Sequence, residues 1–500
     1  MDSLQNLLSG FATALSPDNL LFAFMGSFIG TLVGVLPGIG PTAAMAMLIP
    51  LTFQLPPTGA IIMLAAIYYG SQYGGTITSV LMSVPGEPAS VVTCFDGHPM
   101  AKQGRGGVAL SIAAIGSFLG GTVSILGLVV AAPPLARMAL QFGPAEQFAL
   151  MIFGLSMIMA LAGKSLTKAL ISGVIGLLLA VIGMEPTQAI PRFTFGEKEL
   201  LSGVAFVPVC MGLFGLGEVL ESLEETGQKI LSAKMDSLIP RGNDLKRSGW
   251  PIVRGTVIGF FLGLVPGMIP SLSTFLAYTV ERKVSKHPEE FGNGAIEGVA
   301  APETANNSFV NAALVPLLTL GIPTTPSIAI LMGAFMMNGL IPGPFLFREH
   351  PDIVWAVIAS LYTGNLILLV LNLPLIGLWV KLLELPHALL MAIILAFMLV
   401  GAWSYGNSTF DVGLMVVFGL LGYVMTKLDF PLAPLMLTLI LGPMIEKALR
   451  NSLQMSQGDF SVLVSTPISA VMLLLAAVSL ISSALNFLPT GVSDARSDSE

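Results

Sequence analysis

Apolar runs long enough to cross a lipid bilayer recur along almost the whole chain. Two further apolar segments, 20–53 and 252–280, are interrupted by glycine and proline, which break helices. We therefore expect an all-α polytopic membrane protein with about twelve transmembrane segments. The uninterrupted runs lie at 59–82, 108–132, 146–162, 168–184, 200–220, 305–322, 327–347, 352–380, 387–403, 410–425, 430–446 and 462–486.

Composition excludes a soluble globular protein, because 54% of the residues are hydrophobic and only 10% are charged. The longest charged tract, 221–254, divides the apolar sequence near its middle. We predict a first transmembrane repeat over 1–220, a charged cytoplasmic linker over 221–254 and a second repeat over 255–487. Residues 488–500 are predicted to be a polar tail.

The two halves share their interruptions. GVLPGIGP at 34–41 returns as GLVPGMIP at 263–270, and VPGEP at 84–88 has a counterpart in IPTTP at 322–326. Duplicated halves with broken apolar segments at matching positions indicate the binding site of a secondary transporter. At a constant separation of 229 residues, Gly30, Pro37 and Gly38 correspond to Gly259, Pro266 and Gly267.

Positive charge predicts the orientation of the two broken segments. No lysine or arginine precedes Lys102, so both flanks of the first segment belong outside. Lysines and arginines flank the second segment on both sides, at 246–254 and 282–286, so its flanks belong inside. This pattern predicts two re-entrant broken helices in inverted repeats. The alternative is that each segment forms two ordinary tilted spans joined by a tight turn.

Broken helices leave backbone groups free to bind ligands. The N–H groups that follow the break at 38–42 suit a carboxylate, whereas freed carbonyl groups suit a dehydrated cation such as Na⁺. Thr42 and Ser271 lie just past the two breaks, where we expect them to cap the following helices. The alternative is that glycine and proline only kink these helices.

A stripe of polar residues precedes each of the two later proline-containing segments, 84–88 and 322–326, which we call the tips. Tyr69, Gln72, Tyr73, Thr76 and Ser79 recur at helical spacing, which places them on one face. The second half has the corresponding stripe of Glu303, Asn307 and Asn311, with Asn306 beside it. Such stripes suit a binding site, although hydrogen bonds between membrane helices are the alternative.

Three acidic residues in apolar surroundings are candidates for cation coordination or proton coupling, because buried charge is costly in a membrane. They are Glu87, Glu297 and Glu303. Each of the first two has a structural alternative: Glu87 would only cap a helix start, and Glu297 would lie in an inside loop.

Sequence signals of enzymes are missing. The chain has no H-E-x-x-H or G-x-S-x-G pattern, and AGKS at 162–165 has Ile158 where a phosphate-binding loop needs glycine. The two cysteines and four histidines show no metal-binding spacing, and no basic patch with interleaved aromatic residues suggests nucleic-acid binding. We predict that the protein is not an enzyme and has no cofactor.

Several long motifs together resemble a known family. They read GVLPGIGPTAAMAMLIPLTF, YGGTITSVLMSVPGEPASVVTCFDGHPMAKQGRGG, GVAAPETANNSFVNAALVPLLTLGIPTTPSIAILMGAF and LGPMIEKALRNSL. The chain resembles the large membrane subunit of the tripartite tricarboxylate transporter family over about residues 18–487. The resemblance implies a multi-pass permease of the bacterial inner membrane, and the charge pattern described above places its N-terminus in the periplasm. It also implies two partners, a small four-helix membrane subunit and a periplasmic substrate-binding protein.

The family's motifs fall on particular positions of this sequence. Its glycine-proline signature falls on Pro37, Gly38, Gly40 and Pro41, its PGEP element on 85–88, and its APE-x-x-NN element on 301–307. The later tip departs from the family pattern, with Thr324 where glycine is usual, and the second break reads GMIPS where the first reads GIGPT. These departures bear on the substrate more than on transport, because Thr324 and Thr325 add hydroxyls at a tip.

The predicted function is import of tricarboxylates or related organic carboxylates by cation symport, with Na⁺ or H⁺ as the coupling ion. The alternatives are a stand-alone organic-anion channel or exporter and a membrane assembly protein that transports nothing. The predicted substrate-binding residues are Gly38, Gly40, Thr42, Tyr73, Thr76, Gly267, Ser271, Asn306, Asn307, Asn311, Thr324 and Thr325. The predicted cation-coupling residues are Pro37, Ser79, Glu87, Pro266 and Glu303, with Na⁺ held at the broken-helix carbonyls.

Overall fold

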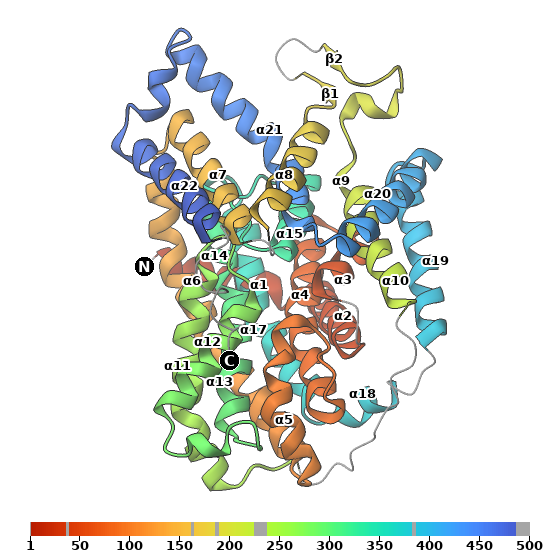
Figure 1. Cartoon of the computed structure of the whole chain (residues 1–500), viewed down its shortest axis with the longest axis vertical. Coiled ribbons are helices and arrows are strands. Elements are labelled where there is room, and N and C mark those ends of the chain that lie inside the picture. The colour runs from red at the N-terminus through yellow and green to blue at the C-terminus, as the bar shows by residue number, and fades with distance from the viewer. Residues whose placement is uncertain are drawn as a thin grey trace, which may run out of the picture. The chain divides into compact units, whose positions relative to one another are not determined.

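Helices make up nearly all of the regular structure in the computed structural model (Figure 1). The structure describes residues 2–36, 40–161, 165–185, 190–224, 238–382 and 387–486. Within these ranges, β structure is limited to β1 (Gly183–Met184), which pairs antiparallel with β2 (Pro191–Arg192). Seven of the described helices are long and apolar enough to cross a membrane. An all-α fold is thereby confirmed, while about twelve crossings and the inverted orientation of the repeats stay predictions.

The chain forms two compact units. The first unit comprises Met1–Gln141 and Ala205–Val424, and the second comprises Phe142–Val204 and Met425–Glu500. The predicted division into repeats follows sequence likeness rather than compactness, and it stays a prediction. Within the predicted linker, residues 242–254 are helical and form the start of α11.

Most of the helices belong to the first unit. The α-helices of its N-terminal part are α1 (Asp2–Ala14), α2 (Pro17–Val35), α3 (Pro41–Leu48), α4 (Pro57–Met82), α5 (Thr93–Lys102) and α6 (Gly106–Ala139). Short turns η1 (Ile49–Thr52) and η2 (Pro88–Val91) follow α3 and precede α5. Its later elements are α9 (Phe206–Cys210), η4 (Met211–Leu216), α10 (Gly217–Ser222), α11 (Gly242–Gly263), α12 (Pro270–Val284), η5 (Pro288–Glu290), α13 (Glu297–Ala312), α14 (Leu314–Leu320), α15 (Pro326–Met337), α16 (Pro344–Glu349), α17 (Pro351–Asn372), α18 (Ile376–Leu382), α19 (His387–Gly406) and most of α20 (Thr409–Lys427).

The second unit is built from two helical segments that are far apart in the sequence. Its first segment holds α7 (Pro144–Leu161), α8 (Leu166–Ala180), the β1–β2 pair and η3 (Glu199–Ser202). Its second segment holds α21 (Leu432–Met455), η6 (Phe460–Val464) and α22 (Pro467–Asn486). Helix α21 packs on α8, and α22 packs on α7.

Glycines let α2 pack directly against the backbone of α4. A Cβ atom on Gly26, Gly30 or Gly34 would lie 2.1–2.5 Å from a carbonyl oxygen of α4, closer than any side chain can approach. Three glycines at four-residue spacing therefore form a ridge along which the two helices touch backbone to backbone. The carbonyls that they meet belong to Met63, Ile67 and Ser71.

The same contact occurs a second time between α11 and α13. A Cβ atom on Gly255, Gly259 or Gly263 would lie 2.3–2.5 Å from a carbonyl oxygen of α13. Each of these glycines follows its counterpart on α2 by 229 residues. The carbonyls that they meet belong to Ala301, Ala305 and Phe309, each of which lies 238 residues after its counterpart on α4. Figure 1 shows α11 and α13 side by side. This duplicated helix contact is what the predicted internal repeat would produce.

Both predicted interruptions are real breaks between helices. Helix α2 ends at Val35 and α3 begins at Pro41, while α11 ends at Gly263 and α12 begins at Pro270. Gly267 adopts a φ of +84°, a left-handed conformation that favours glycine. Pro37 and Gly38, which carry two site predictions, lie outside the described residues.

The predicted capping by Thr42 and Ser271 is wrong. The N-cap positions of α3 and α12 are Gly40 and Ile269, and neither helix has a side-chain cap. Because a proline occupies the first helical position in each case, Thr42 and Ser271 lie one residue further on, inside the first turn and past the N-cap position.

Candidate functional site

Glu303 is a buried carboxylate in the first unit that contacts several other helices. The residue is only 1% exposed, on α13, and its carboxylate accepts hydrogen bonds from two threonines on other helices. Thr76 of α4 donates to it at 2.6 Å, and Thr93 of α5 donates to its other oxygen. Ser117 of α6 donates to the Glu303 backbone carbonyl at 3.2 Å. This glutamate therefore joins α13 to three other helices.

Glu87 forms a second buried carboxylate site just after α4. Its side chain accepts from the Ala89 backbone N–H at 3.0 Å and from Asn306 Nδ2 at 3.1 Å. The amide of Gln72 faces the same carboxylate, and its nitrogen donates to both oxygens at 3.0 and 3.1 Å in the orientation that satisfies both groups. Glu87 caps η2, as the structural alternative proposed, and it also contacts the polar stripes of both halves.

The asparagines of α13 divide their contacts. Asn306 binds Glu87, whereas Asn307 donates to Ser117 Oγ at 2.7 Å. Asn311 donates only to the Asn307 carbonyl of its own helix, at 3.0 Å. Two of the three predicted asparagines thus contact other elements, and the third forms an ordinary bond within its helix.

The tyrosine of the first stripe reaches a residue on α17. Tyr73 donates to Asn365 Oδ1 at 2.7 Å, and the Asn365 amide donates to the Phe118 carbonyl at 2.9 Å and to Thr122 at 3.0 Å. Ser79, on the same stripe, donates to the Gly75 carbonyl of its own helix, at 2.9 Å. On the α4 stripe, Gln72 and Thr76 therefore contact the buried carboxylates of Glu87 and Glu303, whereas Ser79 does not.

The N-terminal turns of two helices that follow breaks meet inside the first unit. Thr42 of α3 and Ser327 of α15 share a hydrogen bond of 2.8 Å between their hydroxyls. Thr325 caps α15 by accepting from the Ile328 N–H at 3.3 Å. The Gly40 N–H, at the start of α3, donates to Glu218 at 2.5 Å.

The second break contacts the later tip through backbone atoms. The Gly267 N–H donates to the Thr324 carbonyl at 3.1 Å, and the Thr324 side chain is 1% exposed. Pro266 and Ser271 are only partly buried, and neither side chain joins the carboxylates. The structure therefore brings together most of the predicted residues in two groups, one around Glu303 and Glu87 and one at the helix starts and tips.

Five residues of these groups were not selected from the sequence as site residues: Gln72, Thr93, Ser117, Glu218 and Asn365. Gln72 and Glu218 carried a usable signal, since one lies on the polar stripe and the other is an acidic residue in an apolar segment. Thr93, Ser117 and Asn365 belong to none of the predicted polar stripes, and only the packing of their helices reveals them.

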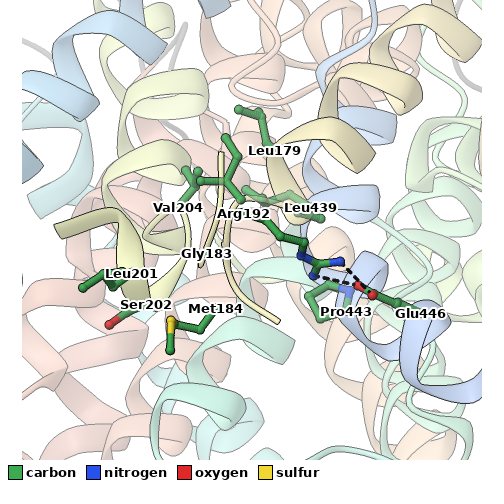
Figure 2. Close-up of a pocket in the computed structure, with 13 residues that line it drawn as sticks. Leu179, Gly183, Met184, Arg192, Leu201, Ser202, Val204, Leu439, Pro443 and Glu446 are labelled. Atoms are coloured by element: carbon green, nitrogen blue, oxygen red, sulfur yellow. Dashed lines mark hydrogen bonds and ion pairs between the residues drawn. The ribbon is translucent and has the colours of Figure 1, made fainter. Parts of the chain in front are cut away.

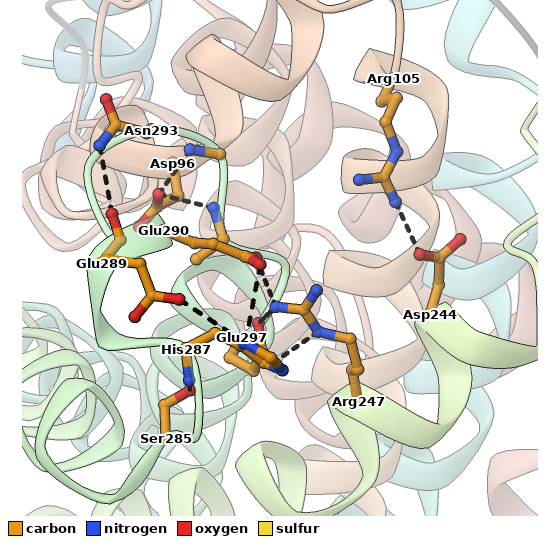
Figure 3. A network of polar contacts seen from close by, with 12 residues as sticks. Asp96, Arg105, Asp244, Arg247, Ser285, His287, Glu289, Glu290, Asn293 and Glu297 are labelled. Atoms are coloured by element: carbon orange, nitrogen blue, oxygen red, sulfur yellow. Dashed lines mark hydrogen bonds and ion pairs between the residues drawn. The ribbon is translucent and has the colours of Figure 1, made fainter.

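A separate network of ion pairs lies around the start of α11 and α13 (Figure 3). Arg247 donates to both oxygens of Glu297, at 2.7 and 2.8 Å, and to Glu290 at 2.6 Å. Arg105 pairs with Asp244 at 2.6 Å. Glu297 begins α13 and points to Arg247, so it belongs to this network and not to the group around Glu303.

A cavity lies in the second unit (Figure 2). It has a volume of about 330 Å³, and the ion pair of Arg192 with Glu446 lies on its wall. The hydrogen bonds from Arg192 to Glu446 raise the pKa of the arginine above its ordinary value. No predicted site residue lines this cavity, so its size alone gives it no role in transport.

Comparison with known proteins identifies the chain's relatives. The model of the tripartite tricarboxylate transporter TctA family matches residues 20–437. The chain belongs to this family. It is therefore the membrane component of a transporter and not an enzyme, which confirms both predictions. With its apolar helices of spanning length, this TctA-family chain is a multi-pass membrane protein.

Two proteins of Agrobacterium vitis are similar to this TctA-family chain. The "Uncharacterized 52.8 kDa protein in TAR-I ttuC' 3'region" is 46% identical over 474 residues, which covers 95% of this chain and 94% of the relative. The "Uncharacterized protein in TAR-II ttuC' 3'region" is 47% identical over 215 residues, 43% of this chain and 89% of the relative. No solved structure matches the chain.

Proposed function

We propose that this TctA-family chain is the permease subunit of a secondary transporter that imports tricarboxylates or related organic carboxylates by cation symport. It works with a small four-helix membrane subunit and with a periplasmic binding protein that delivers the substrate. The chain lies in the bacterial inner membrane with its N-terminus in the periplasm, and Na⁺ or H⁺ is the coupling cation.

The observation that carries the proposal is the pair of buried carboxylates, Glu303 and Glu87. Each accepts hydrogen bonds from neutral groups, and neither forms an ion pair with a lysine or arginine in the part of the chain that the structure describes. An acidic side chain buried in a membrane protein without a basic partner is costly unless it binds a cation or a proton. These two glutamates therefore suit the coupling step.

The helix starts supply a place for the substrate. The N-terminal turns of α3 and α15 meet at Thr42 and Ser327, so the positive ends of two helices point toward the same region. Backbone N–H groups and hydroxyls at such ends bind carboxylate groups. Gly40, Thr42 and Thr325 are the residues that we assign to this role.

The experiment that tests this function measures uptake of labelled di- and tricarboxylates into proteoliposomes. The small membrane subunit is reconstituted with the chain, Na⁺ and H⁺ gradients are imposed separately, and the binding protein is added or left out. Uptake that requires both a gradient and the binding protein supports the symporter and identifies ion and substrate. Flux that needs neither would instead favour a channel or exporter, and no flux with any substrate would favour an assembly protein.

A further inference from the structure

A small cavity lies beside the Glu303 group, between α4, α6 and α17. Its volume is about 10 Å³, which is room for a single water-sized particle or a single small ion. It contains neither Glu303 nor any residue of the two breaks. Its lining consists of Tyr73, Thr76, Ile77, Leu110, Ala113, Ala114, Ser117 and Asn372.

Three hydroxyls line this cavity, and each directs its proton to a partner outside the lining. Thr76 donates to the Glu303 carboxylate at 2.6 Å, and Ser117 donates to the Glu303 carbonyl at 3.2 Å. Tyr73 donates to Asn365 at 2.7 Å. A hydroxyl whose proton is engaged elsewhere has only oxygen lone pairs left for a further partner.

The fourth polar group of the lining is the side chain of Asn372. It is 5% exposed at the end of α17, and its amide nitrogen donates to the Leu368 carbonyl at 3.0 Å. Its Oδ1 atom accepts no hydrogen bond from the described residues. A buried amide oxygen without a partner is unfavourable, and a cation in the cavity would satisfy it.

We propose that this cavity binds a monovalent cation, with Na⁺ as the ion of matching size, through Asn372 Oδ1 and the oxygens of Thr76, Ser117 and Tyr73. The lining offers acceptor oxygens and no free hydroxyl proton, and oxygen is the ligand that hard cations prefer. The proposal rests on the proposed function, since it identifies a binding place for the coupling cation.

The charge around the cavity favours one positive charge rather than two. Its four oxygen ligands are neutral, and a single carboxylate, that of Glu303, lies one hydrogen bond away through Thr76. Sites for divalent cations usually draw on several carboxylates. One nearby negative charge therefore balances one monovalent cation.

The site is also connected to the residues predicted to bind substrate. Thr76 and Ser117 touch the cavity on one side and Glu303 on the other, and Ser117 accepts from Asn307 at 2.7 Å. A cation that coordinates these hydroxyls fixes their orientation and so the hydrogen bonds that hold Glu303 and Asn307. Cation binding in the cavity thereby acts on α13, which carries the polar stripe of the second half.

The test measures Na⁺ binding directly, without substrate or partner subunits. Purified full-length chain is titrated with NaCl at constant ionic strength, with choline chloride as the replacement, and ²²Na⁺ binding and Tm are followed. We expect saturable binding with a rise in Tm in the wild type, and a loss of affinity of about tenfold or more in Asn372→Leu, the size typical of a lost ligand or supporting group in a metal site. Asn372→Asp keeps an oxygen at this position and should retain binding.

Asn338→Leu is the matched control. Asn338 donates to the carbonyl four residues earlier on α15, as Asn372 does on α17, but it does not line the cavity. If Asn372→Leu does not fold, Ala114→Val serves instead, because it keeps every oxygen and fills the space. Na⁺ affinity unchanged in Asn372→Leu or Ala114→Val would overturn the site.

Failure of the site and failure of the proposed function give different results. Two outcomes reject the cavity but not symport. In both, a cation gradient drives uptake, while Na⁺ binding is either unaffected by the Asn372 substitution or absent. Saturable Na⁺ binding that depends on Asn372, in a protein without gradient-driven uptake, supports the cavity and rejects symport.

Discussion

Thr42 and Ser327 share a 2.8 Å hydrogen bond, although 285 residues separate them in the chain. Thr42 belongs to the helix after the first break, and Ser327 to the helix after the last tip. The bond thus joins the first half of the sequence to the second at the two helix starts where we place the carboxylate substrate.

Replacing Thr42 tests that placement. Thr42→Val removes the hydroxyl and keeps the shape, so we expect KM for carboxylate uptake to rise about fivefold, the effect of roughly one hydrogen bond. Its Na⁺ dependence should not change. Thr319→Val is the control, because Thr319 is buried and bonds only within α14. Equal KM values in the two variants would remove Thr42 from the substrate site.

Glu303→Gln tests the coupling role. Glutamine keeps an oxygen for one threonine but carries no charge, so gradient-driven uptake should fall to background while substrate exchange at equal cation concentration persists. The measurement compares the two modes in the same proteoliposomes. Glu297→Gln is the matched control, because Glu297 pairs with Arg247 and does not belong to the group around Glu303. Loss of coupling in the control as well would show that the effect is structural.

The glycine ridges predict a stability effect at equivalent positions. A Cβ atom at Gly30 or Gly259 would lie 2.5 or 2.3 Å from a carbonyl oxygen, so Gly30→Ala and Gly259→Ala should each cost about 1–3 kcal/mol from overpacking. Gly249→Ala, in open space on α11, should be neutral or slightly stabilising. Thermal unfolding in detergent gives the comparison. If Gly30→Ala lowered the stability and Gly259→Ala did not, the two helix contacts would not be equivalent.

Substitutions of Asp96 should affect the loop before α13 to different degrees. One of its carboxylate oxygens accepts from the N–H groups of Gly292, Gly294 and Ala295 at 2.8–2.9 Å. Asp96→Ala removes all three acceptor contacts and should expose the loop at 288–296 to limited proteolysis. Asp96→Asn retains one acceptor oxygen and should stay close to the wild type. Equal cleavage of all three proteins would show that the loop holds its shape without Asp96.

Sequence reasoning identified the features that repeat. The 229-residue separation that relates Gly30 to Gly259 also relates the other glycines of the two ridges, because a duplicated segment carries its packing surface with it. The polar stripes were visible for the same reason, since helical spacing survives in the sequence.

Partners from distant helices were not predictable in this way. Asn365 and Thr93 have other polar residues nearby in the sequence, and nothing in their spacing says which distant helix each of them contacts. The capping prediction for Thr42 failed for a local reason, because a proline at the first helical position shifts the cap one residue earlier, to Gly40. Hydrogen-bond partners of this kind depend on how helices pack, which a single sequence does not specify.

The two glycine ridges also constrain how the protein can move. Where backbone touches backbone along three successive turns, a helix cannot slide past its neighbour without steric collision. We therefore expect α2 and α4 to move together as one rigid unit, and α11 and α13 as another. We expect the change of shape in a transport cycle to occur at the breaks between helices, where single hydrogen bonds such as that from the Gly267 N–H to the Thr324 carbonyl hold the elements together.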